Sequence, residues 1–123
     1  MRKARQWFGS FTASTGEELE KAAPMGSQEN AYLRMVVSYW DMAASFVTSG
    51  VLNEELFVQS GGEMLFVWEK IRPLVDGTRK RMNNPNYCRN LETVATAAIK
   101  RMPAEAYETF SAMVRGMATA SRS

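Results

Sequence analysis

Residues 27–49 constrain the fold of this 123-residue chain more than any other segment, because their apolar side chains cover most sides of a helix. One face follows the 3.6-residue helical repeat: Leu33, Val36, Val37, Trp40, Ala43, Ala44 and Val47. A neighbouring face adds Tyr32, Met35, Tyr39, Met42 and Phe46. Only Glu29, Arg34 and Asp41 are charged. Such a helix must be buried on most sides, either centrally in a bundle or against a second subunit.

The ends of this helix are predicted from local signals. Ser27 is a favourable N-cap, and Gly50 suits the position just after the last turn. Asn53 is expected to cap a second helix over residues 53–75. Because short links join antiparallel neighbours, the two segments predict a long antiparallel helical hairpin, 27–49 with 53–75.

Two adjacent glycines lie inside the second predicted helix. The apolar spacing runs through Gly61 and Gly62, which predicts that they make room for a bulky side chain where two helices approach closely. Tyr39 and Trp40 of the antiparallel partner are the expected occupants, and Trp40 and Trp68 are expected at the centre of the bundle. A break into two helices at Gly61 is the alternative. Pro73 predicts a kink or a helix restart.

The rest of the chain predicts two more helices. A polar connector is expected after Gly77, followed by a third helix that Asn84 caps, that Pro85 opens and that runs to about Arg101. Pro103 is expected to open a fourth helix. No alternating strand pattern competes with these helices.

These elements together predict an all-α, single-domain helical bundle of four to five helices. Residues 1–26 are expected to form an N-terminal arm or a short helix, residues 27–120 the bundle domain, and residues 121–123 a frayed tail. No stretch approaches the ~20 apolar residues of a membrane span. No signal peptide is recognised, so a cytoplasmic location is expected.

Positive charge gathers in residues 70–101, where eight Lys and Arg face only Asp76 and Glu92. Five charged residues in and beside this region are candidate interaction residues: Glu69, Arg72, Arg79, Lys80 and Arg81. The first two are three positions apart, which favours a structural ion pair over a partner-recognition site. The last three favour a solvated connector over a phosphate-binding patch.

Catalytic chemistry finds little support in this composition. The chain has no histidine, the commonest general base and metal ligand, and Cys88 is its only cysteine. A first helical turn could lower the pKa of Cys88, but a structural thiol is favoured over a nucleophile. We expect no catalytic residues, no metal and no cofactor, and therefore no enzyme.

Two stretches of the chain resemble a family of uncharacterised bacterial helical proteins, a domain of unknown function. They are "YWDMAASFVTSGVLNEELFVQSGGEMLFVWEKIRPLV" (39–75) and "NPNYCRNLETVA" (84–95). The shared order is G-x-L-x-E-E-L, a glycine-containing middle, W-E-x-x-R-P, and then an aromatic residue with N-x-E. In many members transmembrane helices precede this domain, whereas residues 1–26 here contain none. The resemblance implies a helical fold and no activity.

Three functions remain open at this stage. The first is a non-enzymatic interaction or scaffold module, working as a homodimer or with another protein. The second is a nucleic-acid-associated regulatory protein that uses the basic region 70–101, which is possible but not favoured. The third is a small-molecule sensor with an apolar pocket between helices.

Overall fold

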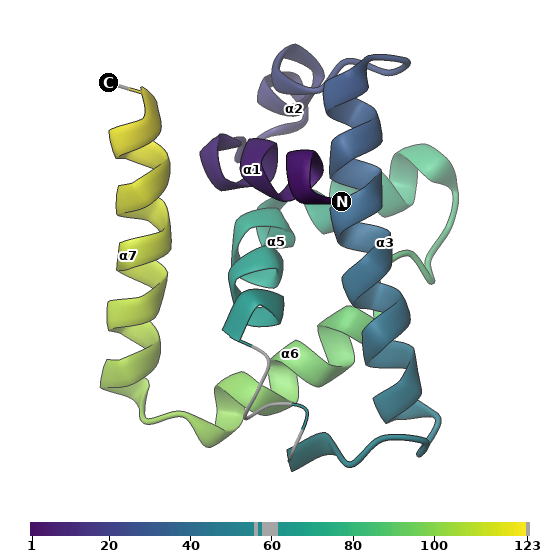
Figure 1. Ribbon diagram of the computed structural model, residues 1–123, viewed down its shortest axis with the longest axis vertical. Coiled ribbons are helices and arrows are strands. Elements are labelled where there is room, and N and C mark those ends of the chain that lie inside the picture. Colours follow the sequence, from purple (N-terminus) through teal and green to yellow (C-terminus); the bar gives the residue numbers. More distant parts are fainter. Residues whose placement is uncertain (56, 58–61, 123) are drawn as a thin grey trace.

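The longest helices of this computed structural model run side by side in an all-α bundle (Figure 1). The structure describes residues 1–55, 57 and 62–122, with side chains up to residue 116. Six helices of seven residues or more lie within these residues: α1 (Arg2–Ser10), α2 (Gly16–Ala22), α3 (Gln28–Thr48), α5 (Gly62–Met82), α6 (Arg89–Arg101) and α7 (Ala104–Arg122). No strand occurs in the described part, so the predicted fold class is confirmed.

The predicted ends of α3 are confirmed in atomic detail. The Ser27 hydroxyl accepts a hydrogen bond from the backbone N–H of Asn30 at 3.1 Å. Gly50 has a φ of 85°, and the N–H of Val51 returns to the carbonyl of Phe46 at 2.9 Å. Glycine adopts this left-handed conformation without a Cβ clash, and it completes a C-terminal cap.

The packing of α3 differs from that of a simple hairpin with α5. It packs most extensively against α6 and α1, and less against α5. Asp41 explains part of this choice, because its carboxylate accepts a hydrogen bond from the backbone N–H of Leu91 in the first turn of α6 at 2.9 Å. The Thr48 hydroxyl adds a 2.7 Å bond to the side chain of Asn90. Polar contacts as well as apolar packing therefore join α3 to α6.

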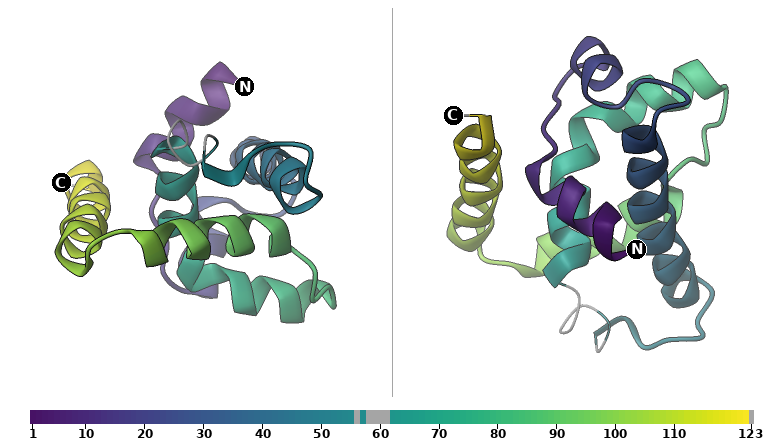
Figure 2. Two further views of the ribbon diagram at one scale, coloured as in Figure 1. Left: turned by 90° about the horizontal axis from the view of Figure 1, so that it is seen from below. Right: turned by 45° about the horizontal axis from the view of Figure 1, so that its top comes forward.

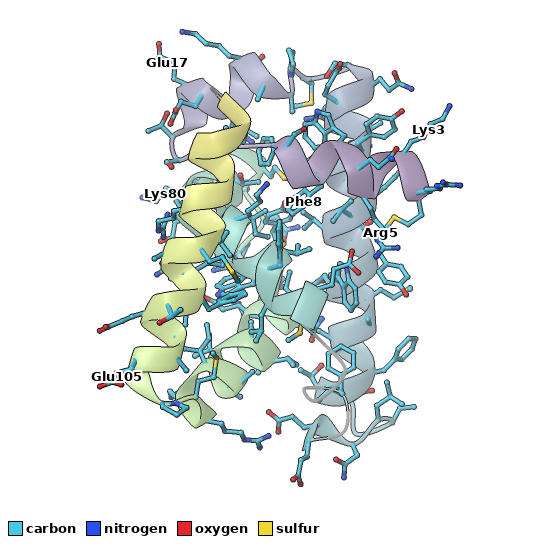
Figure 3. All side chains as sticks on the ribbon, turned by 60° about the vertical axis from the view of Figure 1, so that its left-hand side comes forward. Lys3, Arg5, Phe8, Glu17, Lys80 and Glu105 are labelled. Atoms are coloured by element: carbon cyan, nitrogen blue, oxygen red, sulfur yellow. The ribbon has the colours of Figure 1, made fainter. Side chains whose placement is uncertain are left out.

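Residues 1–26 contribute two helices to the core. Phe8 and Phe11 at the end of α1 are buried, as are Leu19 of α2 and Ala23 just after it. Phe8 faces the interior from α1, whereas Lys3 points outward (Figure 3). The aromatic side chains of this segment pack onto the body of the bundle.

Helix α5 extends further than predicted. It continues through Pro73 and Gly77 to Met82, and its ribbon changes direction along its length (Figure 2). The expected polar connector after Gly77 is therefore wrong. The helix ends only at Asn83, which adopts a φ of 50°. Three basic residues fill the last turn, where the helix dipole favours positive charge.

Helix α6 begins later than predicted. Its first residue is Arg89 rather than Pro85, because residues 85–88 form turns and Cys88 takes a left-handed conformation with a φ of 57°. Asn84 caps a local turn instead, and its side chain accepts a hydrogen bond from the N–H of Asn86 at 3.1 Å. The fourth predicted helix is confirmed, since α7 begins at Ala104, directly after Pro103.

The prediction of close helix packing fails at Gly62. This residue begins α5 and is exposed, and an added Cβ would meet nothing within 4 Å. Trp68 is buried in the core as expected, while Trp40 is half-buried and packs against the core. Gly61, and with it the continuity of the 53–75 helix, lies outside the described residues.

Two glycines therefore offer a matched comparison. Gly62→Ala should leave stability unchanged or raise it by up to about 1 kcal/mol, because the site has room and alanine restricts the unfolded chain. Gly50→Ala should cost about 1–2 kcal/mol, because a Cβ is unfavourable in the left-handed region. Urea unfolding of both variants measures the difference, and equal effects would contradict the two environments.

Candidate functional site

Two consecutive residues of α5, Glu69 and Lys70, are buried although both are charged. They are 1% and 7% exposed. Adjacent positions of a helix point about 100° apart, so the two side chains face different neighbours. A buried charge is tolerated only when hydrogen bonds or an opposite charge satisfy it. Their partners therefore define what α5 holds together.

Lys70 closes the end of α1. Its Nζ donates to the carbonyl oxygens of Phe8, Gly9 and Phe11 at 2.7, 3.0 and 2.6 Å. Carbonyls at a helix C-terminus lack helical partners and attract positive charge. The ammonium also lies 5.3 and 5.1 Å from the ring centroids of Phe8 and Phe66. Burial lowers the pKa of Lys70 to about 8, so it remains charged at neutral pH.

Glu69 holds α7 against α5. Its carboxylate accepts hydrogen bonds from Tyr107 at 2.7 Å, Ser111 at 2.8 Å and Arg115 at 3.3 Å. These three residues recur every fourth position and so share one side of α7. Arg72 adds a 3.0 Å ion pair from α5 itself, as its spacing predicts. The buried carboxylate thus joins two helices, and it is covered from solvent.

The electrostatics of Glu69 follow from these contacts. Burial raises the pKa of Glu69, but hydrogen bonds from Tyr107 and Ser111 and the charge of Arg72 outweigh it. The net effect is a pKa below the usual carboxyl value. The pKa of Tyr107 is raised, by burial and by its hydrogen bond to Glu69. Both groups keep the protonation states that their shared hydrogen bond requires.

The three basic residues 79–81, in the last turn of α5, have different environments. Arg79 has a side chain only 10% exposed, and it donates to Glu92 at 3.0 Å and to the carbonyl of Tyr87 at 2.8 Å. Arg79 therefore stabilises the turn between α5 and α6. Lys80 and Arg81 are exposed and form no ion pair with the described residues. The five predicted candidates do not converge on one site.

Other basic side chains of region 70–101 are also neutralised inside the fold. Arg89 pairs with Glu92 at 2.9 Å, and Arg101 pairs with Glu54 at 3.4 Å. Paired guanidinium groups are less available to phosphate. This weakens the nucleic-acid alternative.

Cys88 is a buried thiol rather than a reactive one. It is the N-cap residue of α6, but burial prevails there, so its pKa is not lowered as the sequence suggested. Burial raises the pKa of Cys88 to about 12. The thiol is therefore protonated at neutral pH.

Cavities give the sensor alternative little support. Apolar side chains of α2, α3 and α5 line a space of only about 20 Å³, far below the ~300 Å³ of small ligand sites. A larger groove between α1 and α5 is open to solvent, with the bidentate Arg5–Glu63 ion pair in its wall. The described residues contain no cluster of three metal-ligating side chains, and none of their helices is long and apolar enough to cross a membrane.

Among the described residues, the outward side of α3 carries a row of exposed large apolar side chains. Four large side chains there are between 43 and 52% exposed: Met35, Tyr39, Met42 and Phe46. We call these four residues the α3 stripe. Helix α3 lies at the outside of the bundle, on the side away from α7 (Figures 1 and 2). Val51 and Leu52, also exposed, extend the apolar surface past the end of the helix. Contiguous exposed apolar surface of this kind marks interaction sites.

Comparison with known proteins gives one match. A family model described as a domain of unknown function (DUF4760) matches residues 1–98, which include the α3 stripe, Glu69 and Lys70. Helix α7 follows the matched stretch. No curated protein and no solved structure matches the chain.

Replacing Lys70 tests its place at the end of α1. Lys70→Met keeps most of the side-chain volume but leaves buried carbonyl oxygens without a donor, so we expect a loss of at least about 2 kcal/mol in unfolding free energy. The exposed Lys80→Met is the control, and it should change stability by less than about 0.5 kcal/mol. Equal effects in urea titrations would contradict the buried role of Lys70.

Acid tests the role of Glu69. Because the pKa of Glu69 in the fold is lower than the ordinary carboxyl value of 4.5, its contribution to stability is complete above that value and disappears as pH falls through the lower folded value. Urea midpoints of the native chain should therefore decrease as the pH falls below 4.5. Glu69→Gln should be less stable at pH 7 and show a shallower pH dependence. An unchanged slope would contradict this account.

Proposed function

Since the chain belongs to the DUF4760 family, whose description names no activity, we propose from its own structure that it is a non-enzymatic interaction module that self-associates through the α3 stripe. The single observation that carries this proposal is the exposure of that stripe. Met42, at 52%, is half exposed in the middle of a helix whose opposite side is buried.

The internal use of the reactive groups supports a non-enzymatic role. The Glu69 carboxylate is saturated by four donors from α5 and α7. The only thiol, Cys88, is buried and protonated. The side chains most suited to chemistry therefore serve the fold. A free buried thiol is also consistent with a cytoplasmic location, which is part of the proposal.

The inner side of α3 supports the choice of surface. Val36, Val37 and Ala44 are buried and face the bundle. The stripe lies away from them on the same helix, so it contributes little to the packing of the described core. Its large apolar side chains gain by being covered, at roughly 25 cal/mol per Å² of apolar surface removed from water.

Introducing a charged side chain into the α3 stripe tests self-association. The native chain should sediment as a dimer at roughly 50 μM, and Met42→Lys should raise the dissociation constant at least about tenfold, since a lysine at a buried interface must lose its hydration. The matched control is Met113→Lys on α7, where the methionine is similarly exposed at 56%. It should leave the dimer intact.

Circular dichroism must show that both variants keep their helices. A native chain that sediments as a monomer, or a dimer that Met42→Lys leaves unchanged, would contradict the proposal.

A further inference from the structure

The spacing of the α3 stripe points to a particular partner geometry. Its four residues are separated by four, three and four positions, which is the a/d spacing of a coiled-coil seam. They alternate in chemistry as methionine, aromatic, methionine, aromatic. We infer that the stripe binds the same stripe of a second copy of this chain, with the two α3 helices antiparallel about a two-fold axis. This inference rests on the proposed function.

The antiparallel arrangement makes the stripe complementary to itself. With the axis between Tyr39 and Met42, Tyr39 faces Met42 of the second copy, and Met35 faces its Phe46. Every layer of the seam then joins a methionine to an aromatic ring. Sulfur–aromatic contacts are favourable, and the flexible methionine adapts to the ring. A two-fold axis repeats each contact, so one pattern satisfies both copies.

Other arrangements use the same residues less well. An antiparallel register shifted towards the N-terminus places Phe46 opposite Gln28, and one shifted towards the C-terminus places Tyr39 opposite Ser49. A parallel pair aligns identical residues, so no layer combines sulfur with a ring. It also aligns the two helix dipoles, whereas an antiparallel pair opposes them favourably.

No charged residue occupies the positions that meet in the antiparallel seam. The four stripe positions are uncharged, and Ser38 and Ser45 beside them are small and neutral. The nearest carboxylate, Asp41, is half-buried and bonded to the N-terminus of α6. Two copies can therefore approach without opposing like charges.

Cysteine cross-linking at the ends of the stripe tests the orientation. Two single variants are made, Met35→Cys and Phe46→Cys, which leave the central layers intact. In the antiparallel dimer, a short bis-maleimide should join the two variants when they are mixed. Neither should cross-link to itself, because identical positions lie about 16 Å apart along the axis at 1.5 Å per residue. The native chain, whose Cys88 is buried, is the control and should not cross-link.

The outcomes separate this inference from the function on which it rests. If each variant cross-links to itself and the two different variants do not cross-link to each other, the dimer is parallel. That result would overturn the orientation alone. A native chain that stays monomeric in sedimentation would overturn both. A dimer in which no combination cross-links would also overturn the inference, because the stripe would not be the interface.

Discussion

The burial of two adjacent opposite charges in α5 is the constraint on which the rest of the fold depends. Glu69 and Lys70 do not neutralise each other. Lys70 is satisfied by backbone carbonyls at the end of α1, and Glu69 mainly by side chains of α7. Each charge therefore requires a second helix at a fixed position, since an unpaired buried charge would cost several kcal/mol. Helix α5 thereby determines where the first and the last helices of the chain lie.

A third polar contact holds α3 against α6. Asp41 accepts a hydrogen bond from the N-terminus of α6, so α3 and α6 are aligned by a directional bond as well as by apolar packing. With one side of α3 held against α6 and α1, its outward side has no neighbour among the described helices. The exposed α3 stripe follows from these internal contacts. Helix α3 is apolar on more sides than the bundle covers, and the uncovered side is the proposed interface.

Helix ends that depend on local signals could be predicted from the sequence, whereas contacts between distant residues could not. Ser27 and Gly50 act within their own turn, so their roles could be read directly. The first turn of α6 is bonded to Asp41, which is distant in sequence, and no local signal predicts that contact. The sequence places Lys70 in a basic region, but it also lies at helical spacing between Val67 and Leu74, both buried. A charged residue inside an apolar spacing was the signal that could have revealed it.

Methionine methyl spectroscopy tests the central claim, that the α3 stripe is the working surface, most directly. Methyl-labelled native chain is diluted from high to low micromolar concentration and the methionine signals are followed. The account predicts that the methyl signals of Met35 and Met42 shift with concentration, while those of the exposed Met82 and Met113 and the buried Met64 do not. Shifts confined to Met82 or Met113, or signals that are all independent of concentration, would contradict it.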